Sequence, residues 1–382
     1  MPKKQITFLL LLLPLLFSLV LWPQAALAAA RDGWQLCTAT LIPSLFPFFV
    51  LTTLLIRLGL PQLLGSVLAP ISRPLLGISG PGASVFLLGL LGGYPVGARS
   101  AAALYASGQC SRQEGEHLLA FCNLCGPSFL LGVVGAGVFQ STAVGLALYA
   151  AHIAAALAVG LLFRLFLHRK KPEPSAVMPK AAPVPSLSNA FLEAVRSSFM
   201  SCLSVCAFVL FFQVVLRMLS VSGLLSLLAR GTAFLLSPLG VTPRWALSFL
   251  AGLLEVTSGV TSLSAGSLPC RIVTAAFLLG WGGLSVHAQA LSVVASSGLS
   301  LRPYFIGKLL HASLSALFIL PFARRWKSTL TVFSPFPAPN VPALAPYWQQ
   351  SLHISLLLCG LLVFFFVKTV VKRRKLSYNK RK

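Results

Sequence analysis

Residues 118–163 indicate the fold class, and they read LLAFCNLCGPSFLLGVVGAGVFQSTAVGLALYAAHIAAALAVGLLF. This stretch contains no Asp, Glu, Lys or Arg. Since a membrane-spanning helix needs about 20 apolar residues, the stretch has room for two spans. Similar uncharged runs cover 197–216, 272–301 and 349–367. The sequence therefore predicts an all-α membrane protein with several spans.

The composition agrees with this prediction. Hydrophobic residues make up 57% of the 382-residue chain and charged residues only 9%, whereas a soluble domain carries about 25% charged residues. The net charge of +24 comes largely from clusters in flanks and loops, at 168–171, 324–327 and 372–375. Such clusters are typical of the cytoplasmic loops of membrane proteins, although the topology predicted below places 324–327 on the outer side. A nucleic-acid partner is therefore excluded.

The N-terminus resembles a signal peptide, because Lys3-Lys4 precedes a leucine-rich stretch and Ala26-Leu27-Ala28. We interpret residues 1–30 as a retained first span, since the later spans are also membrane-bound and need no secretory signal; cleavage stays open. Among the eight cysteines, Cys122 and Cys125 form a C-x-x-C pair, but no second pair with zinc spacing follows. No metal site is expected.

The chain carries an internal duplication. Shifting 40–80 by about 160 positions pairs Ser44 with Ser204, Phe48 with Phe208, Arg57 with Arg217, Ser66 with Ser226 and Gly80 with Gly240. Later blocks pair Ala120-Phe121 with Ala276-Phe277, and His152 with His311. We predict repeats at 31–167 and 190–323, joined by a cytoplasmic linker at 168–189. A Pro-rich loop at 324–350 and a last span with a basic tail at 351–382 follow.

Each repeat is predicted to contain the same series of elements. A span (41–59 and 198–218) is followed by a less hydrophobic helix (60–80 and 220–240), a re-entrant hairpin (83–106 and 246–268), a broken helix (117–139 and 272–297) and a span (141–163 and 303–322). Three crossings per repeat make the second repeat inverted. With the first and last spans there are eight crossings, and both termini lie in the cytoplasm.

Broken helices at matching places in two repeats indicate a transporter's binding site. Backbone at membrane depth must be hydrogen-bonded unless it lines a polar cavity. The predicted substrate-binding residues therefore lie at or beside the breaks: Gly92, Gly93, Tyr94, Pro95, Arg99, Asn123, Gly126, Ser128, Thr257, Ser258, His287 and Gln289.

Three of the candidate side chains carry specific chemistry. Of the six acids, Glu255 alone falls inside an apolar stretch, where a carboxyl group is expensive and usually functional. We expect it to couple transport to a proton or a sodium ion; a structural Glu, protonated or paired, is the alternative. Arg99 could bind a substrate carboxylate through two parallel hydrogen bonds or extend to the membrane interface. His287 could line the cavity or bond another helix, and His152 and His311 are assigned to packing.

Three motifs resemble the YlbJ family of sporulation integral membrane proteins, within the nucleoside-recognition Gate group: LIPSLFPFF at 41–49, GYPVGAR at 93–99 and FCNLCGPS at 121–128. This group is similar to concentrative nucleoside transporters in its hairpins and broken helices. The resemblance implies a transporter in the outer forespore membrane that moves dipicolinic acid toward the forespore. Arg99, Tyr94 and the hairpin-tip amides would contact this flat dianion.

Other functions stay open beside this one. A nucleoside or nucleobase permease, a non-transporting scaffold for spore assembly and an intramembrane hydrolase are the alternatives. No hydrolase or phosphate-binding motif occurs, so we expect no enzyme and no cofactor apart from a coupling proton or sodium ion. The expected partners are membrane lipid and a small anion. The direction of transport and assembly into a homo-oligomer stay undetermined.

Overall fold

A computed structural model describes residues 3–58, 60–167, 186–263 and 266–325, and every regular element within these ranges is helical. The first half of the chain forms α1 (Lys3–Leu21), α2 (Pro23–Leu36), the π-helical segment η1 (Cys37–Leu41), α3 (Ile42–Arg57), α4 (Leu60–Leu76), α5 (Gly80–Gly92), α6 (Val96–Ala106), α7 (Arg112–Phe121), the π-helical segment η2 (Ser128–Val138) and α8 (Thr142–Leu167).

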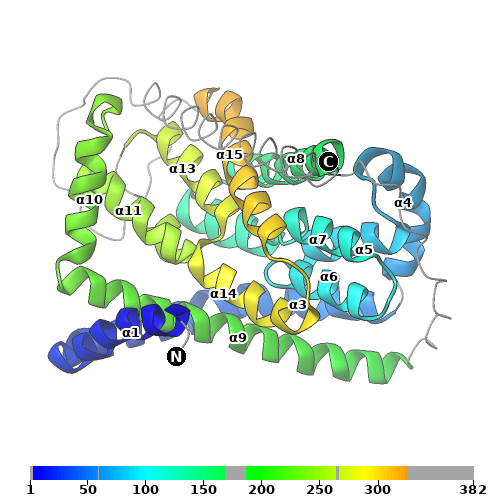
Figure 1. Ribbon diagram of the computed structural model, residues 1–382, viewed down its shortest axis with the longest axis horizontal. Helices are drawn as coiled ribbons and strands as arrows, with labels where there is room; N and C mark the ends of the chain where they lie inside the picture. Colours follow the sequence, from blue (N-terminus) through cyan, green and yellow to red (C-terminus); the bar gives the residue numbers. More distant parts are fainter. Residues whose placement is uncertain (1–2, 59, 168–185, 264–265, 326–382) are drawn as a thin grey trace, which may run out of the picture.

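The second half repeats this series closely. It forms α9 (Leu187–Val221), α10 (Leu224–Leu235), η3 (Ser237–Leu239), α11 (Pro243–Leu254), α12 (Val256–Thr261), α13 (Leu268–Trp281), α14 (Gly283–Val294), η4 (Ala295–Ser297) and α15 (Arg302–Arg325). Figure 1 shows the long helix α9 along one edge, with α10 and α11 at one end and α4 to α7 at the other. The predicted broken stretches are broken in the structure.

Local sequence determines where the broken helices begin and end. Ser79 caps α5, because its hydroxyl accepts a hydrogen bond from the Gly82 amide at 3.1 Å. The helix ends at Gly92, since Gly93 has a φ of +70° that favours glycine. In the second half, α13 ends before Gly282, whose φ is +89°.

The helix boundaries differ from the predictions in two places. The predicted first span at 1–30 ends earlier, because α1 stops at Leu21 and α2 starts at Pro23 at an angle of 101°. Proline lacks an amide proton and fits the first turn of a new helix. From Pro23 the backbone stays helical to Arg57, so residue 30 is no boundary. The predicted linker 168–189 is also shorter, since Ser186 caps α9.

The described residues contain four helices long and apolar enough to cross a membrane, or up to six if each strongly bent pair counts as one span. The bent pairs are α1 with α2 and α4 with α5. The predicted last span and tail, 351–382, and the loop from 326 onward lie outside the described residues. The eight-crossing topology therefore stays a prediction.

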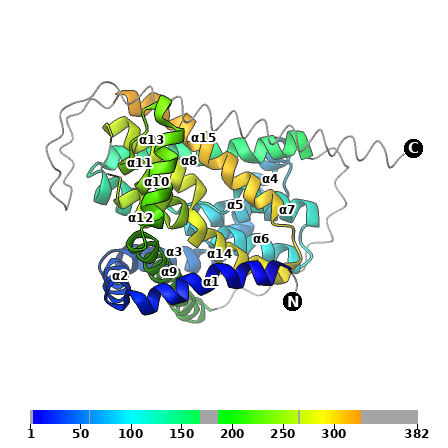
Figure 2. The same cartoon turned by 60° about the vertical axis from the view of Figure 1, so that its left-hand side comes forward.

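The helices pack in two groups. The helix α15 packs on α13, α8 and α7, and α9 packs on α2 and α3. Figure 2 shows α1 and α2 beside α9. The small residue Gly33 lets α2 approach α9, because a Cβ there would lie 3.3 Å from the Cα of Leu210. Residues of α3 and α9 lie beside residues of the broken segments around one cavity.

Candidate functional site

A cavity lies where the two halves of the chain meet. Its first-half wall comes from the α5–α6 break and from the segment around the α7–η2 break. Its second-half wall comes from the α11–α12 break and from α14. The complete lining is Leu41, Leu45, Phe49, Gly92, Gly93, Tyr94, Cys125, Gly126, Ser128, Phe129, Val205, Val209, Glu255, Val256, Thr257, Ser285, Val286 and Gln289. The hairpin breaks of both halves therefore line one cavity.

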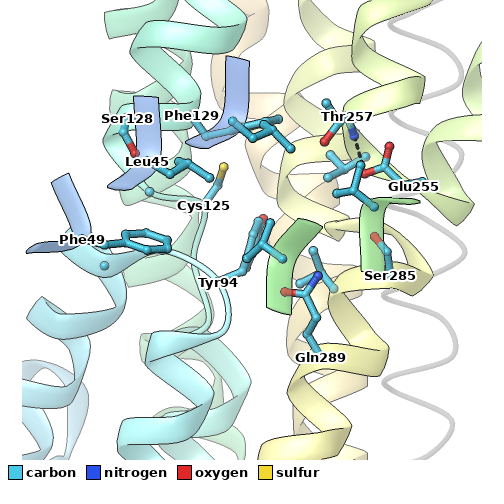
Figure 3. Close-up of a pocket in the computed structure, with 18 residues that line it drawn as sticks. Leu45, Phe49, Tyr94, Cys125, Ser128, Phe129, Glu255, Thr257, Ser285 and Gln289 are labelled. Atoms are coloured by element: carbon cyan, nitrogen blue, oxygen red, sulfur yellow. Dashed lines mark hydrogen bonds between the residues drawn. The ribbon is translucent and has the colours of Figure 1, made fainter. Parts of the chain in front are cut away.

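Figure 3 shows this arrangement directly. Phe49, Cys125 and Ser128 lie on one side, Glu255, Thr257 and Ser285 lie on the other, and Tyr94 lies between them. The hydroxyl of Tyr94 donates a hydrogen bond to the Leu279 carbonyl, at the end of α13. Tyr94 thus joins the hairpin of the first half to the broken helix of the second half.

Glycine allows the two broken segments of the first half to touch. A Cβ on Gly93 would lie 2.9 Å from the amide nitrogen of Gly126 and 3.1 Å from its Cα. Since backbone atoms cannot rotate away, a larger residue would push the α5–α6 break off the α7–η2 break. Gly93 and Gly126 therefore set the shape of this wall.

Glu255 caps the short helix α12 from inside the cavity. Its Oε1 accepts from the Thr257 amide at 2.9 Å, and its Oε2 accepts from the Ser258 amide and the Ser258 hydroxyl, both at 2.6 Å. The residue is 1% exposed and is the one charged residue in the lining given above. Hydrogen bonds to a charged acceptor are shorter and stronger than neutral ones. The carboxyl is thus paired locally at the border of the cavity.

The structure brings together most of the predicted binding residues. Those that line the cavity are Gly92, Gly93, Tyr94, Gly126, Ser128, Thr257 and Gln289, with Glu255. Pro95 and Ser258 are adjacent in sequence to lining residues but are not themselves part of the lining. Asn123 and His287 are buried behind the wall, where Asn123 Nδ2 and His287 Nδ1 each meet the Tyr304 hydroxyl, at 3.3 and 2.9 Å.

The predicted position of Arg99 is corrected. Arg99 is exposed, whereas its neighbours Ala98, Ala101 and Ala102 are buried. Because side chains three and four apart share one helix face, the alanines pack α6 on the core and Arg99 faces away. It does not line the cavity.

The predicted site lacks the apolar wall and one charged residue. Leu41, Leu45 and Phe49 come from η1 and α3, and Val205 and Val209 come from α9; no local signal separates them from the many other apolar residues. Lys308 is different. It lies in the second turn of α15, is 1% exposed and donates to the Asn123 carbonyl at 3.2 Å. A lysine inside the predicted span 303–322 was a usable signal.

Comparison with known proteins gives three matches. The family model described as "Nucleoside recognition" (Gate) matches residues 38–161. The sporulation integral membrane protein YlbJ of Bacillus subtilis (strain 168) is 32% identical over 331 residues, which are 81% of this chain and 80% of the relative.

This chain belongs to the YlbJ family.

The predicted family is thereby confirmed, and with it an integral membrane protein related to sporulation. The structure titled "Structure of CNTnw in an inward-facing substrate-bound state" is also similar, with 17% identity, 72% of this chain and 74% of that chain covered, and a TM-score of 0.48. This score is too low to support an inference about the fold. The all-helical fold class of this YlbJ-family chain is instead confirmed by its own structure.

The outward position of Arg99 leads to a testable expectation for this YlbJ-family protein. Arg99→Ala should change substrate affinity by no more than about twofold, because surface substitutions away from a site shift free energies by about 0.5 kcal/mol or less. Affinity can be measured by isothermal titration of the purified protein with each substrate that it binds. A tenfold loss, about 1.4 kcal/mol, would show that Arg99 reaches the ligand.

Proposed function

We propose that this protein carries a small anion across the membrane through the central cavity, and that dipicolinic acid is the substrate. One observation supports transport above all: the hairpin breaks of both halves line the same cavity. Non-helical backbone at membrane depth is tolerated where it lines a cavity, and transporters bind substrates at such breaks.

The duplication supports an inverted-repeat transporter. His152 and His311, which the sequence alignment pairs, have ring centroids 4.3 Å apart. Equivalent residues of two repeats come close to each other near an internal twofold axis, so this contact supports related halves that meet at the centre. The repeats at 31–167 and 190–323 then move relative to each other during transport.

The charge of Glu255 determines how an anion could bind. Since two negative charges repel strongly in a poorly hydrated site, an anion and the Glu255 carboxylate do not share the cavity well. We therefore propose that the anion binds when Glu255 carries a proton. The protein would then move the anion and the proton together, and Glu255 would be the coupling residue.

The remaining polar groups suit a flat aromatic acid. Tyr94, Phe49 and Phe129 offer ring surfaces, and Ser128, Ser285 and Gln289 offer hydrogen-bonding groups. The aromatic ring of dipicolinate can stack on the first set, and its carboxylates can accept from hydroxyl and amide groups. Thr257 and the glycines at 92, 93 and 126 complete the proposed binding residues.

A nucleoside or nucleobase permease is the second candidate. The match of residues 38–161 to the nucleoside-recognition model favours it. A neutral heterocycle would avoid the repulsion from Glu255 and could bond Gln289 through two hydrogen bonds.

We further propose that the protein lies in the outer forespore membrane of a sporulating bacterium, with both termini in the cytoplasm of the mother cell. The family's link to sporulation and the basic clusters at 168–171 and 372–375 support this placement, because basic loops stay on the cytoplasmic side.

Uptake by proteoliposomes tests the function. The full chain, reconstituted with an inward proton gradient, is expected to concentrate labelled dipicolinate, and unlabelled dipicolinate should compete better than uridine or adenine. Protein-free liposomes are the control. Uptake of the nucleoside instead would favour the permease. Uptake of neither, by protein that is folded and inserted, would favour the scaffold.

A further inference from the structure

Lys308 is a buried cation held at the broken helix of the first half. Its Nζ donates to the Asn123 carbonyl at 3.2 Å and lies 4.8 Å from the centroid of the Tyr94 ring. Asn123 belongs to the non-helical segment that follows the C-terminal end of α7. A helix C-terminus and free carbonyls both attract positive charge. The surroundings of Nζ are therefore those of a bound cation.

No acid neutralises this cation within the part of the chain that the structure describes. The ion pairs found there are Arg57 with Glu193 and Arg112 with Glu116, and neither involves Lys308. The titratable groups close enough to interact with its charge are Cys125, His152, His287 and His311. A buried charge without a partner is strongly unfavourable, so a merely structural residue at this site would be expected to be apolar.

The corresponding place in the second half is occupied by a neutral group. The alignment that pairs Ala120 with Ala276 also pairs Asn123 with Leu279. The Leu279 carbonyl accepts from the Tyr94 hydroxyl, whereas the Asn123 carbonyl accepts from Lys308. Both free carbonyls are thus bonded by a side chain from the other half, and Tyr94 contacts both sites. Only the first-half site holds a positive charge.

We propose that the Lys308 ammonium is a tethered cation, which fills the place where transporters with unwound helices bind a coupling sodium ion. The Asn123 carbonyl of the unwound segment, which would coordinate sodium, already accepts a hydrogen bond from Lys308. Sodium therefore has no role in the cycle. This inference rests on the transport function proposed above and leaves the proton on Glu255 as the coupling ion.

Tyr304 places Lys308 in the site. It precedes Lys308 by four residues, one helical turn, and its hydroxyl meets both Asn123 Nδ2 and His287 Nδ1. These bonds hold α15 in register with the broken helix. In addition, Asn123 Oδ1 and His287 Nε2 are buried and have no hydrogen-bond partner within the described ranges. The neighbourhood is polar enough to hold a charge.

Hydrogen–deuterium exchange of the full chain in lipid nanodiscs tests this proposal without any substrate. In the unmodified protein, exchange of residues 122–127 is expected to be equal in sodium chloride and in choline chloride. Lys308→Arg keeps the charge, so exchange of this segment should stay within about twofold of the unmodified protein. Lys308→Met is close in length but neutral, so exchange should become about tenfold faster. A simple packing role predicts the reverse order, because Met fits an apolar site better than the larger Arg.

Two results would overturn the proposal. One is slower exchange of this segment in sodium than in choline in the unmodified protein, together with saturable binding of radioactive sodium. The other is a Lys308→Met variant as protected as the unmodified protein. If Lys308→Met does not fold, the comparison of exchange in sodium chloride and choline chloride on the unmodified protein still tests the proposal. Failure to take up dipicolinate would count against the transport function alone, since neither measurement uses a substrate.

Discussion

Glu255→Gln is expected to abolish concentrative uptake while preserving exchange of substrate across the membrane. Gln has nearly the same size and resembles the protonated carboxyl, so the cavity should still admit the anion. It cannot release a proton, so a proton gradient can no longer drive accumulation. The ratio of internal to external substrate should fall to about one, because a residue that carries the coupling proton is required for coupling but not for binding.

The measurement is uptake by proteoliposomes under an inward proton gradient, compared with counterflow of labelled substrate at equal pH on both sides. Glu114→Gln is a matched control. Glu114 is also buried, at 8% exposure, and accepts from the Ser79 amide at 2.6 Å, but it does not line the cavity. Both variants lose a charged acceptor, which costs about 1.5–3 kcal/mol of stability. If Glu255→Gln still accumulates substrate, or if both variants lose accumulation equally, Glu255 only stabilises the fold.

Gly97→Ala is expected to prevent formation of the site. A Cβ on Gly97 in α6 would lie well inside contact distance of the Cys122 carbonyl oxygen, and close to the Cα of Asn123. Gly89 in α5 approaches the same carbonyl from the other arm of the hairpin. These are backbone atoms, so the hairpin must move away from the segment after α7. Overpacking a core costs about 1–3 kcal/mol when side chains can adjust, and here we expect at least about 3 kcal/mol.

Thermal unfolding in detergent, with the yield of monodisperse protein, measures this effect. Gly231→Ala is the control, because Gly231 lies in α10 with no heavy atom within 4 Å of an added Cβ. There alanine should raise stability by about 0.5–1 kcal/mol, since it restricts the unfolded chain and favours the helix. If Gly97→Ala unfolds at the same temperature as the unmodified protein, the hairpin is not packed on the broken helix.

The broken segments were predictable because their signals are local. Gly92-Gly93-Tyr94-Pro95 and Cys125-Gly126-Pro127 interrupt apolar runs with residues that end helices. Glu255 stands out because a carboxyl group inside such a run is rare. Each signal is contained within a few neighbouring residues, and the structure has a helix break at each of these places.

The positions of the Arg99 and Lys308 side chains were harder to predict from the sequence, for different reasons. Arg99 follows the hairpin tip closely, but the direction of its side chain depends on which face of α6 packs inward. Lys308 lies six residues after Arg302, near the start of a predicted span, where a lysine usually extends to the membrane surface. Its burial depends on the distant segment around Asn123, which no nearby residue reveals.

By itself the sequence determined that the chain lies in a membrane, that it is helical, where its helices break and which family it belongs to. The first three properties follow from composition, from the length of apolar runs and from residues that end helices, all of which act over short stretches. The family follows from the resemblance of the motifs at 41–49, 93–99 and 121–128. Only the tertiary structure decided that the breaks of both halves line one cavity, that α3 and α9 supply its apolar wall, and that Lys308 rather than Arg99 is the buried cation. These features depend on contacts between residues far apart in the chain, which local patterns do not encode.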